Sequence, residues 1–277
     1  MEFWILLLAG IFLGLVYVLE KKLSSENFHP ATFVALISGV SGLVSIPLLL
    51  YQFKVPENIL FWILAFVSVA TYGIGYLFSF KAYKLIDVSE IGLINRLNIV
   101  FTAIVAILFL SETYTTYSYI GFLLIFIGSL IIVFKRGKII INKGLLFALI
   151  MAMGFGLSAV FDKVLVSQFS PFTYVVINNL AVSLLFFSFR EARQESVRLF
   201  KSKPIPILLT GILSAISWVG FLFVLQSGAV SKIFPIYDTL SLICIVGMGI
   251  LFLGEKEKIL QKISGSILVI IGVFLLG

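Results

Sequence analysis

Long apolar runs, separated by short polar connections, follow one another from one end of this chain to the other. In a run such as residues 104–110, which reads Ile-Val-Ala-Ile-Leu-Phe-Leu, every side chain is apolar rather than every second one. A transmembrane helix needs about 20 mostly apolar residues, whereas a strand of a membrane β-barrel alternates apolar with polar side chains. The runs therefore predict membrane-spanning α-helices.

Charged or proline-containing breaks divide the sequence into ten such segments. They cover residues 2–22, 31–52, 59–81, 90–111, 116–134, 144–166, 171–189, 205–227, 232–253 and 259–276. The longest polar connection, from Arg190 to Pro204, is too short to fold as a soluble domain. Because Met1, Glu2 and Phe3 lack the positive charge of a signal peptide, we expect the first segment to remain as a span. The sequence predicts an all-α integral membrane protein with ten transmembrane helices.

The composition excludes the common soluble classes. Hydrophobic residues make up 61% of the chain and charged residues 12%, against about 45–50% and about 25% in soluble domains. With one cysteine and one histidine, no disulfide can form within the chain, and the usual sulfur and imidazole metal ligands are missing. The sequence also has no glycine–lysine phosphate-binding loop. We therefore expect no enzyme activity, no metal, no cofactor and no nucleic-acid partner.

An internal repeat is the second strong feature. The clearest match pairs Phe109-Leu110-Ser111-Glu112 with Phe252-Leu253-Gly254-Glu255, at an offset of 143 residues. Further matches, at offsets of 142 to 144, are Gly14, Glu20 and Lys21 with Gly156, Asp162 and Lys163, Val88-Ser89 with Val230-Ser231, and Gly121 and Gly128 with Gly265 and Gly272. Matches that keep their order and spacing predict a duplicated unit of five helices. We expect the repeats to cover residues 1–138 and 139–277.

The odd number of helices in each unit has a topological consequence. A second copy of five helices enters the membrane from the opposite side, so the two repeats are inverted relative to each other. Inverted repeats are the architecture of many secondary transporters, in which the substrate site lies near the midplane between the halves and is exposed to each side in turn. The repeat therefore predicts a secondary transporter that works by alternating access at a central cavity.

Each unit has Phe-Leu-(Ser/Gly)-Glu closing its fourth helix and glycines spaced along its fifth. We expect the glutamates of these sequences, Glu112 and Glu255, to have a structural role in the turn. The pattern resembles the drug/metabolite transporter superfamily, and within it the EamA type, over essentially the whole chain. The resemblance implies a cavity lined by the first, third, fourth, sixth, eighth and ninth helices, and often by the second and seventh. It also implies that the fifth and tenth helices lie at the periphery or in a dimer interface.

Basic residues are distributed unevenly between the two ends of the predicted helices. The end away from the termini has Lys21, Lys22, Lys81, Lys84, Lys135, Arg136, Lys138, Lys143, Arg190, Arg193, Arg198, Lys201, Lys203, Lys256, Lys258 and Lys262, and the end with the termini has Lys54, Lys163 and Lys232. Because basic residues favour the cytoplasmic side, this distribution predicts a cell (inner) membrane protein with both termini outside. The resemblance implies cytoplasmic termini, so this orientation would be a departure from many relatives.

Two ionisable residues fall deep enough inside predicted spans to stand out, because a charge in a membrane is costly and usually marks a pathway or a pair. Arg96 lies in the first turns of the fourth helix and Asp238 in the first turns of the ninth, at equivalent positions of the two repeats. They could form a structural latch with each other or with neighbours, or extend towards the interface. Alternatively, they could bind the two charged ends of a zwitterion such as an amino acid.

Polar side chains also form stripes on four of the helices expected around the cavity. Lipid offers no hydrogen bonds, so such a stripe faces protein or a cavity. One stripe alone could simply join two helices, but four together favour a cavity. The predicted substrate-binding residues are Asn95, Asn98, Tyr72, Tyr76, Ser79, Ser217, Trp218, Tyr237 and Ser241, together with Arg96 and Asp238.

Further charged residues lie near the ends of the first and sixth helices, on opposite faces of the membrane. Glu20 ends the first helix, and Asp162 and Lys163 end the sixth. Interfacial anchoring explains such residues, but they could also serve as gates or proton sites. Gly156 marks a point at which the sixth helix could bend. We therefore predict Glu20, Asp162, Lys163 and Gly156 as gating residues.

Together these features predict an exporter of small polar metabolites such as amino acids, with protons as a candidate coupling ion. We expect a small-molecule substrate, a lipid bilayer around the protein, and a monomer or homodimer. Two alternatives stay open. One is a small multidrug or lipid-linked sugar exporter of the same superfamily, and the other is a membrane scaffold that transports nothing.

Overall fold

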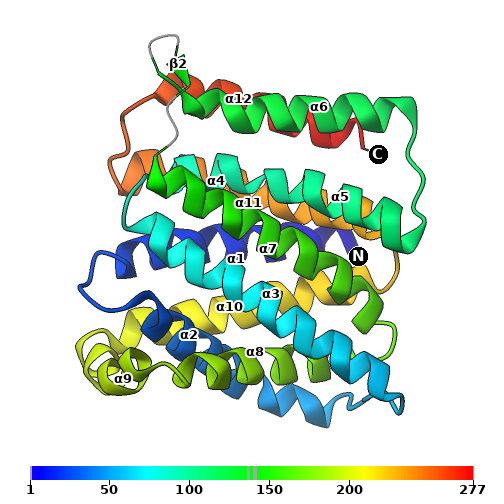
Figure 1. Ribbon diagram of the computed structural model, residues 1–277, viewed down its shortest axis with the longest axis vertical. Helices are drawn as coiled ribbons and strands as arrows, with labels where there is room; N and C mark the ends of the chain where they lie inside the picture. The colour runs from blue at the N-terminus through cyan, green and yellow to red at the C-terminus, as the bar shows by residue number, and fades with distance from the viewer. Residues whose placement is uncertain (1, 136–137, 140–141, 277) are drawn as a thin grey trace.

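The computed structural model describes residues 2–135, 138–139 and 142–276 (Figure 1). Its elements in chain order are α1 (Glu2–Leu23), α2 (Pro30–Ser45), η1 (Ile46–Leu50), α3 (Ile59–Tyr83), α4 (Val88–Asn95), α5 (Leu97–Leu110), α6 (Thr116–Leu130), η2 (Ile131–Val133), β1 (Phe134–Lys135), β2 (Lys138–Ile139), α7 (Lys143–Leu165), α8 (Pro171–Phe187), α9 (Arg190–Ser202), α10 (Pro204–Leu225), α11 (Val230–Phe252) and α12 (Ile259–Phe274). The described part of the chain is therefore almost entirely helical.

Several helices begin where the sequence supplies a capping side chain. Asn58 accepts a hydrogen bond from the amide of Leu60 at the start of α3, and Asn142 accepts one from Leu145 at the start of α7. At the start of α8, Ser170 caps the helix and Pro171 occupies the first turn, where a missing N–H costs nothing. The helix boundaries thus follow local sequence as well as hydrophobicity.

Most of these helices are long and apolar enough to cross a membrane. Among the described residues, seven spans meet that test, with α4 and α5 counted as one, and the bent pair α8 and α9 adds an eighth. The helices α6 and α12 are apolar but shorter. The protein is therefore an integral membrane protein with several spans. Each of the ten predicted spans corresponds to an apolar helix, but the number of ten crossings stays a prediction.

The longest polar connection, between Arg190 and Pro204, is largely helical. It contains α9, which is bent by 110° from α8 and lies at the left-hand end of the bundle in Figure 1. Its buried residues, Ala192, Ser196 and Leu199, recur at helical spacing on one face, so the periodicity of this segment indicates an amphipathic helix. Glu195 anchors the helix by accepting hydrogen bonds from the His29 amide and the Thr32 hydroxyl, at 2.7 and 2.9 Å.

The two halves of the chain are interleaved in the bundle. In Figure 1, α6 and α12 form an outer layer at the top, α2 and α8 lie at the bottom, and the remaining long helices lie between them. The third predicted span of the first half, α3, packs on α7, and the third predicted span of the second half, α10, packs on α1. The third span of each half therefore packs on the first helix of the other half. The predicted boundary between residues 138 and 139 falls at the β1–β2 hairpin that joins the halves.

Glycines allow the outer pair α6 and α12 to approach closely. A Cβ atom built on Gly128 would lie 2.7 Å from the carbonyl oxygen of Gly265, and one built on Gly265 would lie 2.7 Å from that of Gly128. Such distances are too short for any side chain, so glycine is required on both helices. Small residues that bring two backbones together are a common basis of helix packing in membranes.

Candidate functional site

A cavity of about 90 Å³ lies at the centre of the bundle, between α1, α3, α5, α7, α10 and α11. These helices come from both halves of the chain. The lining residues are Leu13, Val16, Tyr17, Glu20, Tyr72, Tyr76, Tyr83, Asn98, Phe155, Ser158, Ala159, Asp162, Ser214, Trp218, Phe221, Phe234, Tyr237 and Asp238. The cavity is therefore surrounded by aromatic rings and contains three carboxylates.

Glu20 lies on the α1 side of the cavity and is 3% exposed. The hydroxyl of Tyr76 donates a hydrogen bond to its Oε1 at 2.6 Å, and that of Tyr83 donates to its Oε2 at 3.0 Å. Both tyrosines come from α3 and lie seven residues apart, so they project from one face of that helix. The carboxylate is held by neutral donors.

Asp162 occupies the equivalent position on α7 and is 4% exposed. Its Oδ1 accepts hydrogen bonds from the hydroxyl of Tyr174 at 2.7 Å and from Ser68 at 3.4 Å. Asn178 donates in turn to the Tyr174 hydroxyl at 3.2 Å. This carboxylate is thus also held by neutral groups, with Ser68 on α3, the helix that supplies both donors to Glu20, and Tyr174 on α8.

Neither carboxylate has a basic partner in the part of the chain that the structure describes, where the ion pairs involve other acidic residues. The adjacent lysines point elsewhere. Lys21 Nζ donates to the carbonyl oxygen of Tyr83 at 2.6 Å, and Lys163 Nζ donates to that of Leu225 at 2.9 Å. Lys21 therefore binds the carbonyl end of α3 and Lys163 that of α10, where positive charge is favourable. For Lys163 the structure shows this contact, and a gating role stays a prediction.

Aromatic rings form the walls between the two carboxylates. Tyr72 stacks on Trp218, with ring centroids 5.3 Å apart and planes 6° apart. Phe221 stacks on Tyr237 with centroids 4.5 Å apart. The faces of such rings attract cations, most strongly for tryptophan. A cavity with carboxylates and ring faces is suited to a positively charged group.

Arg96 and Asp238 form an ion pair between α4–α5 and α11. Arg96 is 0% exposed and Asp238 2% exposed. Arg96 also donates from Nε to the carbonyl of Gly92 and from Nη2 to the hydroxyl of Ser241, both at 3.1 Å. The arginine lies at the break between α4 and α5 and does not line the cavity, whereas Asp238 does. The structure shows the two side chains paired with each other, and whether they also bind a substrate stays a prediction.

The other predicted substrate-binding residues divide into two groups. Asn98, Tyr72, Tyr76, Trp218 and Tyr237 line the cavity, as do Glu20 and Asp162. Asn95, Ser79, Ser217 and Ser241 lie behind the lining and support it. Asn95 Nδ2 donates to the Tyr17 hydroxyl at 3.0 Å, and the hydroxyls of Ser217 and Tyr237 are 2.8 Å apart. Whether any of these residues binds a substrate stays a prediction.

The predicted gating residue Gly156 lies where α7 crosses α5. A Cβ atom built on it would lie 2.7 Å from the carbonyl oxygen of Asn98. The equivalent glycine, Gly14, meets Ser241 and Cys244 of α11 in the same way. Close packing therefore explains the choice of glycine at this position, and bending of α7 stays a prediction.

Several cavity residues were not predicted from the sequence, among them Tyr17, Tyr83 and Ser158. A signal was present, because Tyr17 lies three residues before Glu20 and Ser158 four residues before Asp162, on the same helix faces. Tyr83 lies seven residues after Tyr76, in the stripe already recognised on that helix. Extending each stripe by one helical turn would have found all three.

Comparison with known proteins identifies the fold. The family model described as "EamA-like transporter family" matches residues 1–134 and again residues 142–277. No curated protein matches the sequence. One solved structure, described only as the crystal structure of a protein, has a similar fold, with a TM-score of 0.68 and 16% sequence identity over 98% of this chain and 95% of that one. With two consecutive matches that together span nearly all of its residues, the chain belongs to the EamA-like transporter family of the drug/metabolite transporter superfamily.

Proposed function

We propose that the protein is a secondary transporter of small metabolites that carry a protonated amine, amino acids among them, and that it works by alternating access between its two repeats. Export is the proposed direction. The observation that carries the proposal is the pair of buried carboxylates, Glu20 and Asp162, which line one aromatic cavity without a basic partner among the described residues.

A buried carboxylate without a counter-ion is unfavourable, because a charge needs a partner in a medium of low dielectric constant. Tyrosine hydroxyls supply hydrogen bonds at Glu20 but no positive charge. A substrate ammonium group, or a proton, would supply that charge. The carboxylate end of an amino acid would find N–H and O–H donors in Asn98 and the tyrosines of the lining. Arg96 is not available for that end, because it is paired with Asp238.

The size of the cavity supports a transport cycle with large movements. Its volume of about 90 Å³ is well below the roughly 300–1,000 Å³ of a typical ligand pocket. A metabolite therefore enters only when the helices around the cavity move apart. Because those helices come from both halves of the chain, movement of one repeat against the other would open the cavity.

The distribution of basic residues supports a location in the cell membrane with both termini outside. The end of the bundle that carries α9 and the β1–β2 hairpin is rich in lysine and arginine, and the chain termini lie towards the other end (Figure 1). Basic connections remain on the cytoplasmic side during insertion. Tagging of either terminus and protease treatment of intact cells would test this orientation.

Lipophilic cations are a second candidate class of substrate. The parallel rings of Tyr72 and Trp218 favour this class, because a flat aromatic cation could lie against them. The two classes differ in what competes with them. A small amine without an aromatic part should displace an amine metabolite but should displace a flat lipophilic cation poorly.

Counterflow in proteoliposomes tests the proposal. Matched amines, amino acids and carboxylates without an amine would first be compared by thermal shift, and the best ligand would then be measured as a labelled substrate. Glu20→Gln and Asp162→Asn should each reduce counterflow by at least about tenfold, since each removes a charge–charge contact worth more than about 1.4 kcal/mol. Glu57→Gln, which changes an exposed acidic residue outside the cavity, is the matched control. Preference for carboxylates without an amine, or full counterflow in both cavity variants, would refute the proposed substrate class.

A further inference from the structure

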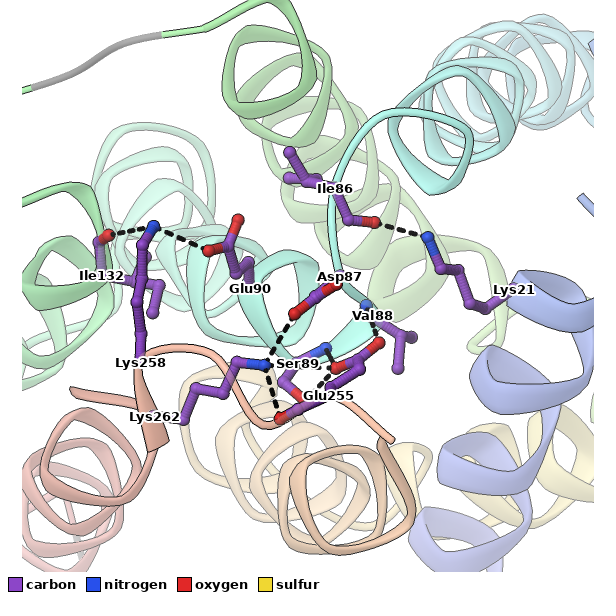
Figure 2. A network of polar contacts seen from close by, with 10 residues as sticks. All are labelled: Lys21, Ile86, Asp87, Val88, Ser89, Glu90, Ile132, Glu255, Lys258 and Lys262. Atoms are coloured by element: carbon purple, nitrogen blue, oxygen red, sulfur yellow. Dashed lines mark hydrogen bonds and ion pairs between the residues drawn. The ribbon is translucent and has the colours of Figure 1, made fainter. Parts of the chain in front are cut away.

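At the end of the bundle that carries the hairpin, a glutamate from one half of the chain binds the start of a helix from the other half. Glu255 follows α11, and its Oε1 accepts a hydrogen bond from the amide of Val88 at 2.7 Å (Figure 2). Its Oε2 accepts one from the amide of Ser89 at 3.0 Å and one from the Ser89 hydroxyl at 2.5 Å. The residue before α4, Asp87, makes no capping bond of its own. Glu255 therefore caps α4 from across the repeat boundary.

Two lysines of the second half strengthen this contact. Lys262 is 0% exposed, and its Nζ lies 2.8 Å from Asp87 Oδ2 and 3.1 Å from the carbonyl oxygen of Glu255. Lys258 Nζ pairs with Glu90 at 2.7 Å (Figure 2). The segment after α11 is thus tied to the start of α4 by one carboxylate and two ammonium groups. We call this set of contacts the clasp.

The opposite end of the bundle has the same turn. Ser111 and Gly254, at equivalent positions, both have left-handed backbone conformations, with φ of 53° and 69°. The amide of Glu112 then binds the carbonyl of Ala106 at 3.3 Å, as the amide of Glu255 binds that of Gly249 at 3.0 Å. In both cases the amide binds the carbonyl of the residue six positions earlier, so α5 and α11 end in the same type of turn. Glu112 therefore leaves its helix in the same geometry as Glu255.

The partners of Glu112 differ from those of Glu255. The residues equivalent to Val88 and Ser89 are Val230 and Ser231, the first residues of α11. Among the described hydrogen bonds, none joins Glu112 to the amide of either residue. Glu112 instead accepts one from the Tyr114 hydroxyl at 3.3 Å, and this hydroxyl also bonds to the Ser231 side chain, so it stands between Glu112 and the start of α11. The residue before α11 is Ala229, which has no side chain that could cap the helix. The first half also has no lysine or arginine in residues 113–119, which follow Glu112.

We propose that Glu255 and Glu112 are positioning residues that alternately close the two ends of the protein. In this structure the clasp at Glu255 is formed and the equivalent contact at Glu112 is open. In the opposite state, Glu255 releases Val88 and Ser89, and the Glu112 carboxylate binds the amides of Val230 and Ser231. The exchange follows from the repeat, because inverted halves that swap conformations also swap their contacts. The proposal rests on the alternating access of the proposed function but on no particular substrate.

Cysteine accessibility can follow this exchange without any substrate. Cys244 is the only cysteine, so a Cys244→Ser background accepts single reporters. Val16→Cys and Ser158→Cys are matched reporters, because both residues line the cavity and occupy equivalent positions of the repeats. A membrane-impermeant maleimide would be added to proteoliposomes from each side, and the labelling rate of each reporter would be measured.

Opening of the clasp should change the two reporters in opposite directions. Glu255→Gln should raise the labelling of the Val16→Cys reporter from the clasp side by about tenfold, the effect of losing about 1.4 kcal/mol in favour of the closed end. It should lower the labelling of the Ser158→Cys reporter from the other side. Glu112→Gln should have the reverse effects, and the double variant should lie between the two. If Glu255→Gln does not fold, Ser89→Ala, which removes one hydroxyl donor, should give a smaller change in the same direction.

Unchanged labelling, or a rise of both reporters together from both sides, would overturn the proposal, since the second result means general loosening. Opposite changes of the reporters without any amine counterflow would support the proposed exchange at Glu255 and Glu112 and would refute the proposed substrate class. Normal amine counterflow in Glu255→Gln and Glu112→Gln, with unchanged labelling, would support the proposed function. It would refute the proposal that these glutamates alternately close the two ends.

Discussion

The ion pair between Arg96 and Asp238 gives the sharpest test of how charge stabilises this bundle. Replacement of Asp238 by asparagine would leave the Arg96 guanidinium fully buried without its negatively charged partner, and its hydrogen bonds to the Gly92 carbonyl and the Ser241 hydroxyl supply no compensating charge. A buried charge that loses its partner destabilises a protein by about 3–5 kcal/mol. We therefore expect the free energy of unfolding of Asp238→Asn to fall by about that amount.

The double variant Arg96→Met/Asp238→Asn removes both charges and keeps side chains of similar volume. Because desolvation offsets much of the attraction within a buried pair, its replacement by neutral groups is often close to neutral. We expect the double variant to recover most of the stability lost by Asp238→Asn. Reversible unfolding in mixed detergent micelles measures the free energy, and Glu57→Gln, at an exposed position, should stay within about 0.5 kcal/mol of the unchanged protein.

The same three proteins separate a structural pair from a substrate-binding pair. If Arg96 and Asp238 only join α4–α5 to α11, counterflow per folded molecule should return in the double variant together with stability. If they bind a zwitterion, the double variant should fold but remain inactive. A single variant Asp238→Asn as stable as the unchanged protein would refute the reasoning, because it would mean that the guanidinium is not confined to a dry site.

Three further changes have clear expected results. Gly128→Leu should destabilise the protein by about 1–3 kcal/mol in the same micelle unfolding assay, because α12 leaves no room for a Cβ. Gly247→Ala, with nothing within 4 Å of the added Cβ, is the matched control and should be tolerated. Tyr83→Phe removes one donor to Glu20 and should weaken amine binding measured by thermal shift, since hydrogen bonds to charged groups contribute about 1.5–3 kcal/mol. Lys163→Met removes a bond to a helix end and should lower stability by about 0.3–1 kcal/mol without changing counterflow; lost counterflow at normal stability would support gating by Lys163 instead.

The sequence was most informative where the signal is local. An apolar run specifies a membrane helix through its own residues, and the repeat is visible because both copies kept short matching stretches. The position of the helix α9 against the bundle was missed for the opposite reason. Its inward residues, Ala192, Ser196 and Leu199, bury little surface, and its position depends on Glu195 reaching the start of α2. No property of residues 190–204 alone contains that contact.

The candidate site was predictable in its helices but not in its pairings. Stripes at helical spacing placed Tyr72, Tyr76 and Trp218 on inward faces, and these residues line the cavity. The donors to Glu20, by contrast, come from a helix more than 50 residues away in the sequence. The ion pair of Arg96 with Asp238 depends on the break between α4 and α5, which the apolar pattern does not reveal. Spacing within a helix gives a face, but the choice of partner is decided by how the helices pack.

The contacts at the Glu255 end of the bundle differ from those at the Glu112 end, and this difference affects the relative free energies of the states in the proposed transport cycle. Two identical halves would make the two end-closed states equal in free energy. Among the described residues, Lys258 and Lys262 make ion pairs at the Glu255 end, and no ion pair involves Glu112 at the other end. Each factor of ten by which such pairs favour closure of one end corresponds to about 1.4 kcal/mol. A ligand shifts such an equilibrium only through its different affinity for the two states. If the clasp opens and closes as proposed, the substrate or coupling ion must bind more strongly when it is open, and neutral replacements of both lysines should reduce the difference in affinity that is needed.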